Sequence, residues 1–126
     1  MYALGIVKDF TARHYLIGGD WGTENEEHDH HYRIELRVEG PDLDRHGYLV
    51  DITALEAHME ELISGFSGRV LNHLPCFEGL NPSIERLARI LCDELSGRLS
   101  KAEGLSLQVR VWENENAWAS YRRDIP

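Results

Sequence analysis

The sequence is poor in cysteine, in basic residues and in long apolar segments, and each shortage excludes a class of protein. Its two cysteines, Cys76 and Cys92, form no Cys-x-x-Cys or zinc-ribbon spacing. Lys and Arg number 13 against 22 Asp and Glu, so the net charge of -9 offers no basic surface for nucleic acid or an anionic membrane. No apolar run is long enough to span a bilayer. The expected ligand is therefore a small molecule.

The length of the chain indicates the number of domains, and its first residues indicate the cellular location to expect. At 126 residues the chain fits a single domain, residues 1–126, with a core that needs no disulfide or metal to hold it. It opens directly into a strand-like segment, without a positively charged stretch followed by an apolar one. We therefore expect a soluble cytoplasmic protein.

The hydrophobic period alternates between 2 and 3.6 along the chain, which predicts both strands and helices. Strands are predicted near residues 1–16, from Tyr32 to Glu39, at 105–111 and at 118–121. Asp51 is a predicted N-cap for a helix reaching Phe66, and Pro82 is predicted at the first position of a second helix through Leu95. Because strands and helices come in separate blocks, the sequence predicts an α+β domain with both helices on one face of a four-stranded antiparallel sheet.

The segment EEHDHHY, residues 26–32, raises the question of a metal site. On a strand, His28 and His30 point to the face that carries Tyr32, whereas His31 points the other way. His14 continues the buried face of the first strand and would lie at the same end of the hairpin. Three imidazoles with an open position are typical of catalytic zinc. From spacing alone, a metal site and a histidine-rich polar turn remain equal alternatives.

Glu113 stands at the end of the third predicted strand, on the parity of Val109 and Val111. A carboxylate that continues a buried face needs a partner, and the paired N–H groups of a pterin or purine would supply one. The alternative is a strand-end glutamate that turns to water.

Six blocks span essentially the whole chain: FTARH (10–14), HDHHY (28–32), HGYLVDI (46–52), LN (71–72), NPSIE (81–85) and VWENENAWASY (111–121). In their order and spacing, these blocks resemble those of the 6-pyruvoyl tetrahydropterin synthase and 6-carboxytetrahydropterin synthase (QueD) family.

The resemblance implies a tunnelling fold, in which small α+β subunits join their sheets into a barrel as a trimer or a hexamer, with active sites between subunits. It implies a zinc cofactor held by His14, His28 and His30. It further implies a pterin-like substrate anchored by Glu113, with Ser83 to Glu85 in the pterin pocket.

The sequence departs from the family at the catalytic residues. No cysteine precedes the histidine block, and Glu24 stands where the catalytic cysteine would be, with Glu26 and Glu27 as alternative bases. The Asp-His pair that would precede the LN block falls on Ser67 and Gly68, neither of which can relay a proton as histidine does. His73 is the nearest histidine, and an exposed loop position is the better interpretation of it.

Two functions are consistent with these residues. The first is a zinc-dependent lyase that acts on the side chain of a dihydroneopterin-type substrate, with Glu24 as base. Family members with glutamate in place of the cysteine look suited to retro-aldol removal of that side chain, which gives 6-hydroxymethyl dihydropterin. The second is a zinc- and pterin-binding protein that has lost catalysis. A glutamate carboxylate directed at the metal site favours the enzyme, and a loop turned away favours the binding protein.

Overall fold

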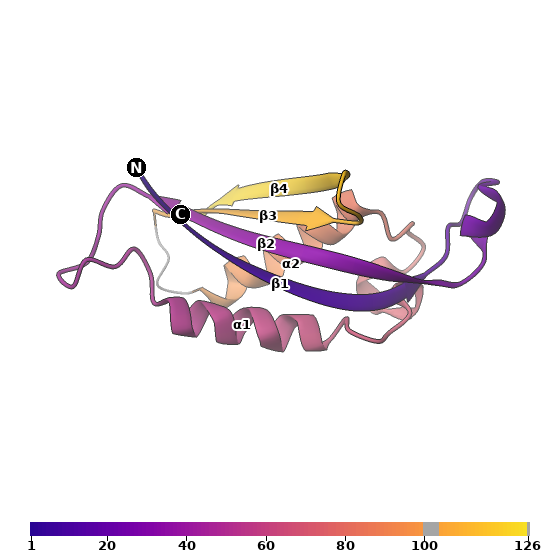
Figure 1. Ribbon diagram of the computed structural model, residues 1–126, viewed down its shortest axis with the longest axis horizontal. Helices are drawn as coiled ribbons and strands as arrows, with labels where there is room; N and C mark the ends of the chain where they lie inside the picture. Colours follow the sequence, from indigo (N-terminus) through magenta and orange to yellow (C-terminus); the bar gives the residue numbers. More distant parts are fainter. Residues whose placement is uncertain (100–103, 126) are drawn as a thin grey trace.

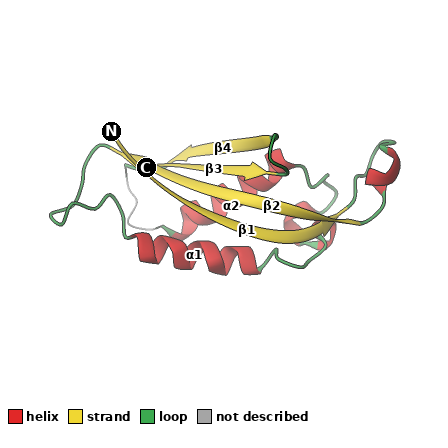
Figure 2. Cartoon of the chain, viewed as in Figure 1, coloured by secondary structure: helices red, strands yellow, loops and turns green. Residues whose placement is uncertain are grey.

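The computed structural model of the protein describes residues 1–99 and 104–125. Four antiparallel strands form one sheet in the order β1-β2-β3-β4, and both helices cover the same face of it (Figure 1, Figure 2). This arrangement confirms the α+β architecture predicted from the sequence. The elements are β1 (Tyr2–His14), β2 (His28–Gly40), α1 (Ile52–Ser64), α2 (Ile84–Arg98), β3 (Ser106–Trp112) and β4 (Trp118–Asp124).

The long hairpin of β1 and β2 forms half of the sheet. Its register runs from the pair Tyr2 and Gly40 at one end to the pair His14 and His28 at the other. Side chains alternate between the two faces of each strand, so the even-numbered residues of both strands point toward the helices. The first strand ends at His14, two residues short of its predicted end.

The core fills the space between the sheet and the two helices. Lys8 is the exception on the covered face of β1, and its ammonium group reaches Glu60 of α1, with 3.1 Å between Nζ and Oε1. Cys92 is fully buried, and burial raises the pKa of its thiol to about 11. The largest fully buried side chains are Tyr32, Phe77, Ile34, Leu36, Leu55, Met59, Leu71, Leu87, Leu91, Leu95, Leu107 and Val38.

Side-chain caps fix where both helices begin. The Asp51 carboxylate accepts hydrogen bonds from the backbone N–H groups of Thr53 and Ala54, as the sequence predicts. The prediction for Pro82 is wrong, because the second helix begins at Ile84. The Ser83 hydroxyl accepts a hydrogen bond from Arg86 N, which makes Ser83 the N-cap and leaves Pro82 before it. Within the described residues, no helix has both the length and the apolar character to cross a membrane.

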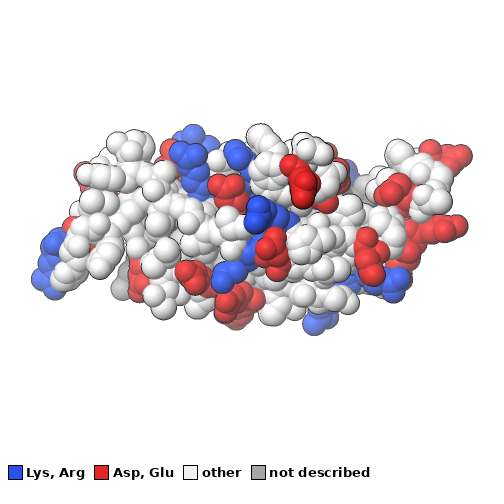
Figure 3. Space-filling view, in the orientation of Figure 1, with Lys and Arg blue, Asp and Glu red and all other residues white. Residues whose placement is uncertain are grey.

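Within residues 1–99 and 104–125, no helix covers the other face of the sheet, which is polar. Its strands place basic and acidic side chains opposite one another, as in the pairs Arg33–Asp9 and Arg110–Glu35. Acidic and basic groups are accordingly interspersed on the visible surface (Figure 3). Loops 15–27 and 41–51 project beyond opposite ends of the sheet (Figure 1).

Replacement of Asp51 by alanine tests the cap of α1. Loss of a carboxylate that accepts two backbone N–H groups should lower the free energy of unfolding by about 1 kcal/mol. Urea unfolding at fixed protein concentration measures this difference. Asp42→Ala, at an exposed position in the preceding loop, is the matched control and should leave the midpoint unchanged.

Candidate active site

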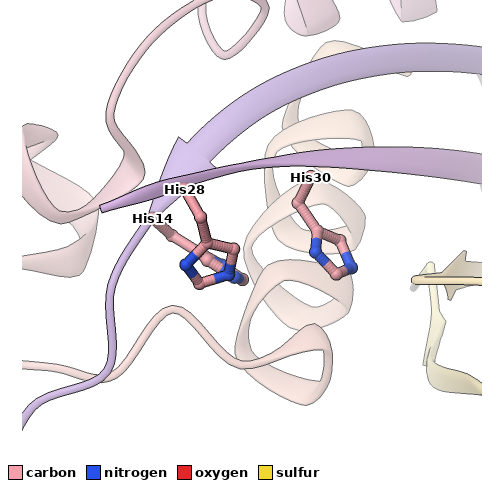
Figure 4. Close-up of side chains that lie close together, drawn as sticks. All are labelled: His14, His28 and His30. Atoms are coloured by element: carbon pink, nitrogen blue, oxygen red, sulfur yellow. The ribbon is translucent and has the colours of Figure 1, made fainter. Parts of the chain in front are cut away.

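Three histidines meet at one end of the β1–β2 hairpin. His14 is the cross-strand partner of His28, and His30 faces Ala12 two residues further along β2. One nitrogen from each imidazole lies within 4.8 Å of the other two, close enough for a single metal ion to bind all three. The rings project to the same side of the hairpin (Figure 4). The shared face predicted from strand alternation is therefore present.

The free ring nitrogens of this cluster fit a bound cation. The Nε2 atoms of His28 and His30 are buried and have no hydrogen-bond partner in the described part of the chain. A buried polar atom without a partner is costly, and a metal ion would satisfy both at once. Each residue offers an imidazole nitrogen, a ligand atom that suits zinc.

Neighbouring groups orient two of the rings through their Nδ1 atoms. The Tyr32 hydroxyl lies 2.9 Å from Nδ1 of His14, and both groups are buried. The backbone carbonyl of Glu26 lies 2.8 Å from Nδ1 of His28 and can accept a hydrogen bond from it. With Nδ1 engaged in each case, Nε2 is the atom left for a metal, as in many zinc sites.

The environment keeps His14 neutral. Burial is the largest cause that lowers its pKa to about 4, and the neighbouring His28 and His30 contribute in the same direction. Burial also raises the pKa of Tyr32, with a smaller contribution from the negative charge of Glu113. At neutral pH the site therefore presents an uncharged imidazole held by an uncharged phenol, which is the state required of a metal ligand and its support.

Glu24 directs its carboxylate at the histidine cluster. It lies in a one-turn 3-10 helix (Gly22–Asn25), and its Oε2 is 3.1 Å from Nε2 of His28. That distance is short, but the direction is not that of a hydrogen bond, so Nε2 remains unsatisfied. Of the alternative bases, Glu27 pairs with Arg13 at 3.0 Å, and Glu26 meets His28 through its backbone carbonyl. Glu24 alone of these three glutamates brings its side chain to the cluster.

Glu113 lies directly after β3, on the same side as the cluster. Its Oε2 is 4.0 Å from Nε2 of His30, and its side chain is 39% exposed. It is thus neither fully buried nor turned away, which is intermediate between the two alternatives of the sequence analysis. Half exposure next to the histidines leaves its carboxylate accessible to a ligand.

The first turn of α2 supplies the other residues predicted for a substrate pocket. The Ser83 hydroxyl already serves as the cap of α2, and Glu85 is exposed in the first helical turn. Their role in binding remains a prediction.

Comparison with known proteins gives the family. The sequence pattern of 6-pyruvoyl tetrahydropterin synthase matches residues 4–124. The chain belongs to this family. It is 28% identical over 122 residues to a candidate 6-carboxy-5,6,7,8-tetrahydropterin synthase of Archaeoglobus fulgidus, covering 95% of each chain.

Solved structures of the synthase family share the fold. The 6-pyruvoyl tetrahydropterin synthase of Caenorhabditis elegans superposes with a TM-score of 0.87 at 20% identity, covering 98% of this chain and 96% of that one. The Plasmodium vivax synthase gives a TM-score of 0.77 at 15% identity over 99% and 100%. These likenesses confirm the tunnelling fold of the subunit.

The loop after α1 contains no proton relay at the positions where the synthase family would have its Asp-His pair. Gly68 adopts a φ of 73° and donates its backbone N–H to Thr11 O at 2.7 Å, and Ser67 beside it is exposed. His73 is also exposed, and its ring packs at 6.3 Å from that of Tyr15. The interpretation of His73 as a surface histidine is therefore confirmed.

Sequence reasoning missed two kinds of supporting residue. It placed Tyr32 on the core face without recognising that its hydroxyl holds His14. It also gave no role to Asn25, Asn72 and Asn81, whose side chains bind the backbone of the loop between β1 and β2. The contacts of Tyr32, Asn72 and Asn81 join residues 18, 57 and 64 positions apart, so spacing offered no signal for them. Those of Asn25 are local and lie within the loop.

Replacement of Tyr32 by phenylalanine tests the support of His14. Loss of the hydroxyl leaves Nδ1 of a buried imidazole unpaired, so affinity for Zn²⁺ should fall about tenfold or more while the fold is retained. Competition with a chromogenic chelator measures the affinity. Tyr48→Phe, which alters a side chain that is 64% exposed, should bind Zn²⁺ like the wild type.

Proposed function

We propose that the protein is a zinc-dependent lyase that removes the side chain of a dihydroneopterin-type substrate. The observation that carries this proposal is the position of Glu24, whose carboxylate lies 3.1 Å from the His28 nitrogen available to a metal. A base at this position can take the proton of a substrate hydroxyl held at the same site. The family membership supports a pterin substrate.

His14, His28 and His30 would hold the zinc ion through their Nε2 atoms. When bound there, zinc would supply Lewis acidity, which would polarise a side-chain oxygen and bring the pKa of a substrate hydroxyl toward neutrality. The proposal does not require a fourth protein ligand, and a three-histidine set leaves a position for substrate.

In the proposed reaction, Glu24 removes the proton from the hydroxyl on the second side-chain carbon. The bond between the first and second carbons breaks, the second carbon becomes an aldehyde, and the electron pair passes into the pterin ring. The proton on Glu24 returns to the first carbon, giving the 6-hydroxymethyl dihydropterin and a two-carbon aldehyde. One carboxylate therefore suffices as base and acid.

A relative supports glutamate in this role. A variant of the Plasmodium vivax 6-pyruvoyltetrahydropterin synthase, with a TM-score of 0.76 and 14% identity to this chain, is described as a catalytic residue mutant in which glutamate is replaced by alanine. A glutamate thus belongs to the catalytic residues of that enzyme. Glu24 is the corresponding candidate here.

The pterin ring would be anchored by Glu113, with Ser83 and Glu85 at the border of the pocket. Its carboxylate is next to His30 and partly accessible, so it can accept two N–H groups of the ring. Synthesis of the pyruvoyl product would require proton movement between side-chain carbons, and Ser67 and Gly68 provide no group for it.

The alternative function is a zinc- and pterin-binding protein without catalysis. That function would leave the loop that carries Glu24 free to turn away from the histidines. The Glu24–His28 distance favours the enzyme, and turnover decides between the two.

The decisive experiment is a turnover assay of zinc-loaded protein with dihydroneopterin and with its triphosphate, with products identified by mass. We expect side-chain cleavage and little or no pyruvoyl product. Glu24→Ala should lower the rate of cleavage by about 100-fold or more, while the protein retains one zinc per chain. Glu26→Ala is the matched control and should cleave normally. Cleavage that survives the loss of Glu24, or abundant pyruvoyl product, would contradict the proposal.

Glu113→Gln tests the pterin anchor. An amide presents one acceptor and one donor where a carboxylate presents two acceptors, so one hydrogen bond is lost and one repulsive contact appears. Pterin affinity should fall by about 2 to 4 kcal/mol, measured by calorimetry on zinc-loaded protein. Zinc content should not change. Equal affinity in the two proteins would show that Glu113 faces water in the complex.

The sheet edges and the family fold support a homo-oligomer, as a trimer or a hexamer. Within the described residues, β1 and β4 each pair with only one strand along their length, and open edges of this kind are closed when subunits join into a barrel. Light scattering at micromolar concentration should therefore give three or six times the 14.5 kDa mass of the chain. A monomer under these conditions would refute the assembly.

A further inference from the structure

The backbone just beyond β1 is held by side chains instead of by a neighbouring strand. Asn72 binds both polar groups of Tyr15, accepting from its N–H at 3.0 Å and donating to its carbonyl at 2.8 Å. Asn81 binds Ile17 in the same way, at 2.7 and 2.9 Å. Leu16 between them donates to Glu24 O at 2.9 Å and accepts from Asn25 Nδ2 at 3.0 Å. Every backbone N–H and carbonyl of residues 15–17 is thereby paired.

Asn25 closes the remainder of the loop around Glu24. Besides Leu16, its amide donates to the carbonyl of Gly19 at 3.0 Å and accepts from the N–H of Trp21 at 2.7 Å. It therefore connects both ends of the segment from 16 to 21. Glu24 is its immediate neighbour and shares the attachment to Leu16.

The Glu24 side chain has little packing of its own. It is 55% exposed, in a projecting loop whose nearby Trp21 is 47% exposed. An exposed carboxylate is held in one place only if its backbone is fixed, because rotamer freedom and water compete with any single contact. The asparagine contacts supply that fixed backbone.

We propose that Asn25, Asn72 and Asn81 are positioning residues that hold the Glu24 carboxylate at the three-histidine site. The inference rests on the proposed role of Glu24 as base. It assigns to the three asparagines the task of fixing the loop that carries Glu24. The amide group is needed because each of these side chains donates to a carbonyl and accepts from an N–H. Aspartate has the same shape but offers only acceptors, so it would repel the carbonyl groups.

A purely structural role for the asparagines makes a different prediction from a positioning role. Destabilisation of the subunit would reduce metal binding and activity whether or not Glu24 is present. Positioning acts through Glu24, so the effect of an asparagine substitution should vanish once Glu24 is removed. A double-mutant cycle separates the two.

The experiment uses the 126-residue chain loaded with Co²⁺, whose visible absorption responds to the charges and groups around the ion. Glu24→Ala should change this spectrum, and Asn25→Asp should change it in the same direction with one Co²⁺ per chain retained. In the double variant, Asn25→Asp should add no further change. Asn116→Asp makes the same chemical substitution at an exposed turn and should give the wild-type spectrum.

Zinc-loaded Asn25→Asp should also lose about tenfold or more in kcat with little change in KM, because a misplaced base slows chemistry without removing the pterin contacts.

Asn81→Asp is the second variant if Asn25→Asp does not fold. A wild-type spectrum in Asn25→Asp or in Glu24→Ala would overturn the inference, as would an equal spectral change from Asn25→Asp with and without Glu24. Absence of turnover in the wild type, with the spectral pattern as expected, would refute the lyase alone.

Discussion

The register of the β1–β2 hairpin is the constraint on which the site depends. It makes His14 and His28 cross-strand partners and brings His30 and Tyr32 onto the same face. A slip of one residue would move every side chain of one strand to the opposite face, separating the histidines and exposing the core residues of that strand. Packing of the covered face against α1 and α2 therefore fixes the geometry of the cluster as well as the stability of the fold.

The three imidazoles lie close together at a partly buried site, and this leaves some of their ring nitrogens without hydrogen-bond partners. His14 retains one partner in Tyr32, whereas two Nε2 atoms are left unsatisfied within the described chain. Burial and the neighbouring rings also depress the pKa of His14, so protonation does not relieve the cost at neutral pH. The fold thus maintains an arrangement that is unfavourable without a cation, as expected where a site is organised before its ligand arrives.

Much of this could be predicted from the sequence because it follows from local periodicity. Strict alternation from Tyr32 to Glu39 identified β2 and its buried face, and the same parity grouped His28 with His30. Pro82 shows where local signals compete, because Ser83 offers a better cap and moves the helix start to Ile84. The orientation of Glu24 was not predictable, because the loop that carries it is bound by Asn72 and Asn81, which contact Tyr15 and Ile17 across 57 and 64 positions of sequence.

The conformation of Gly68 determines what a histidine at this position would cost. Its φ of 73° lies in the left-handed region, which favours glycine. A histidine at this position would have a strained backbone, although no atom lies within 4 Å of the position of its Cβ. The N–H of Gly68 donates to Thr11 O on the edge of β1, a hydrogen bond that any residue except proline would keep. The left-handed backbone therefore opposes a histidine at this position by about 1 to 2 kcal/mol, so an acid-histidine pair at 67 and 68 would lower the stability of the loop without requiring it to be rebuilt.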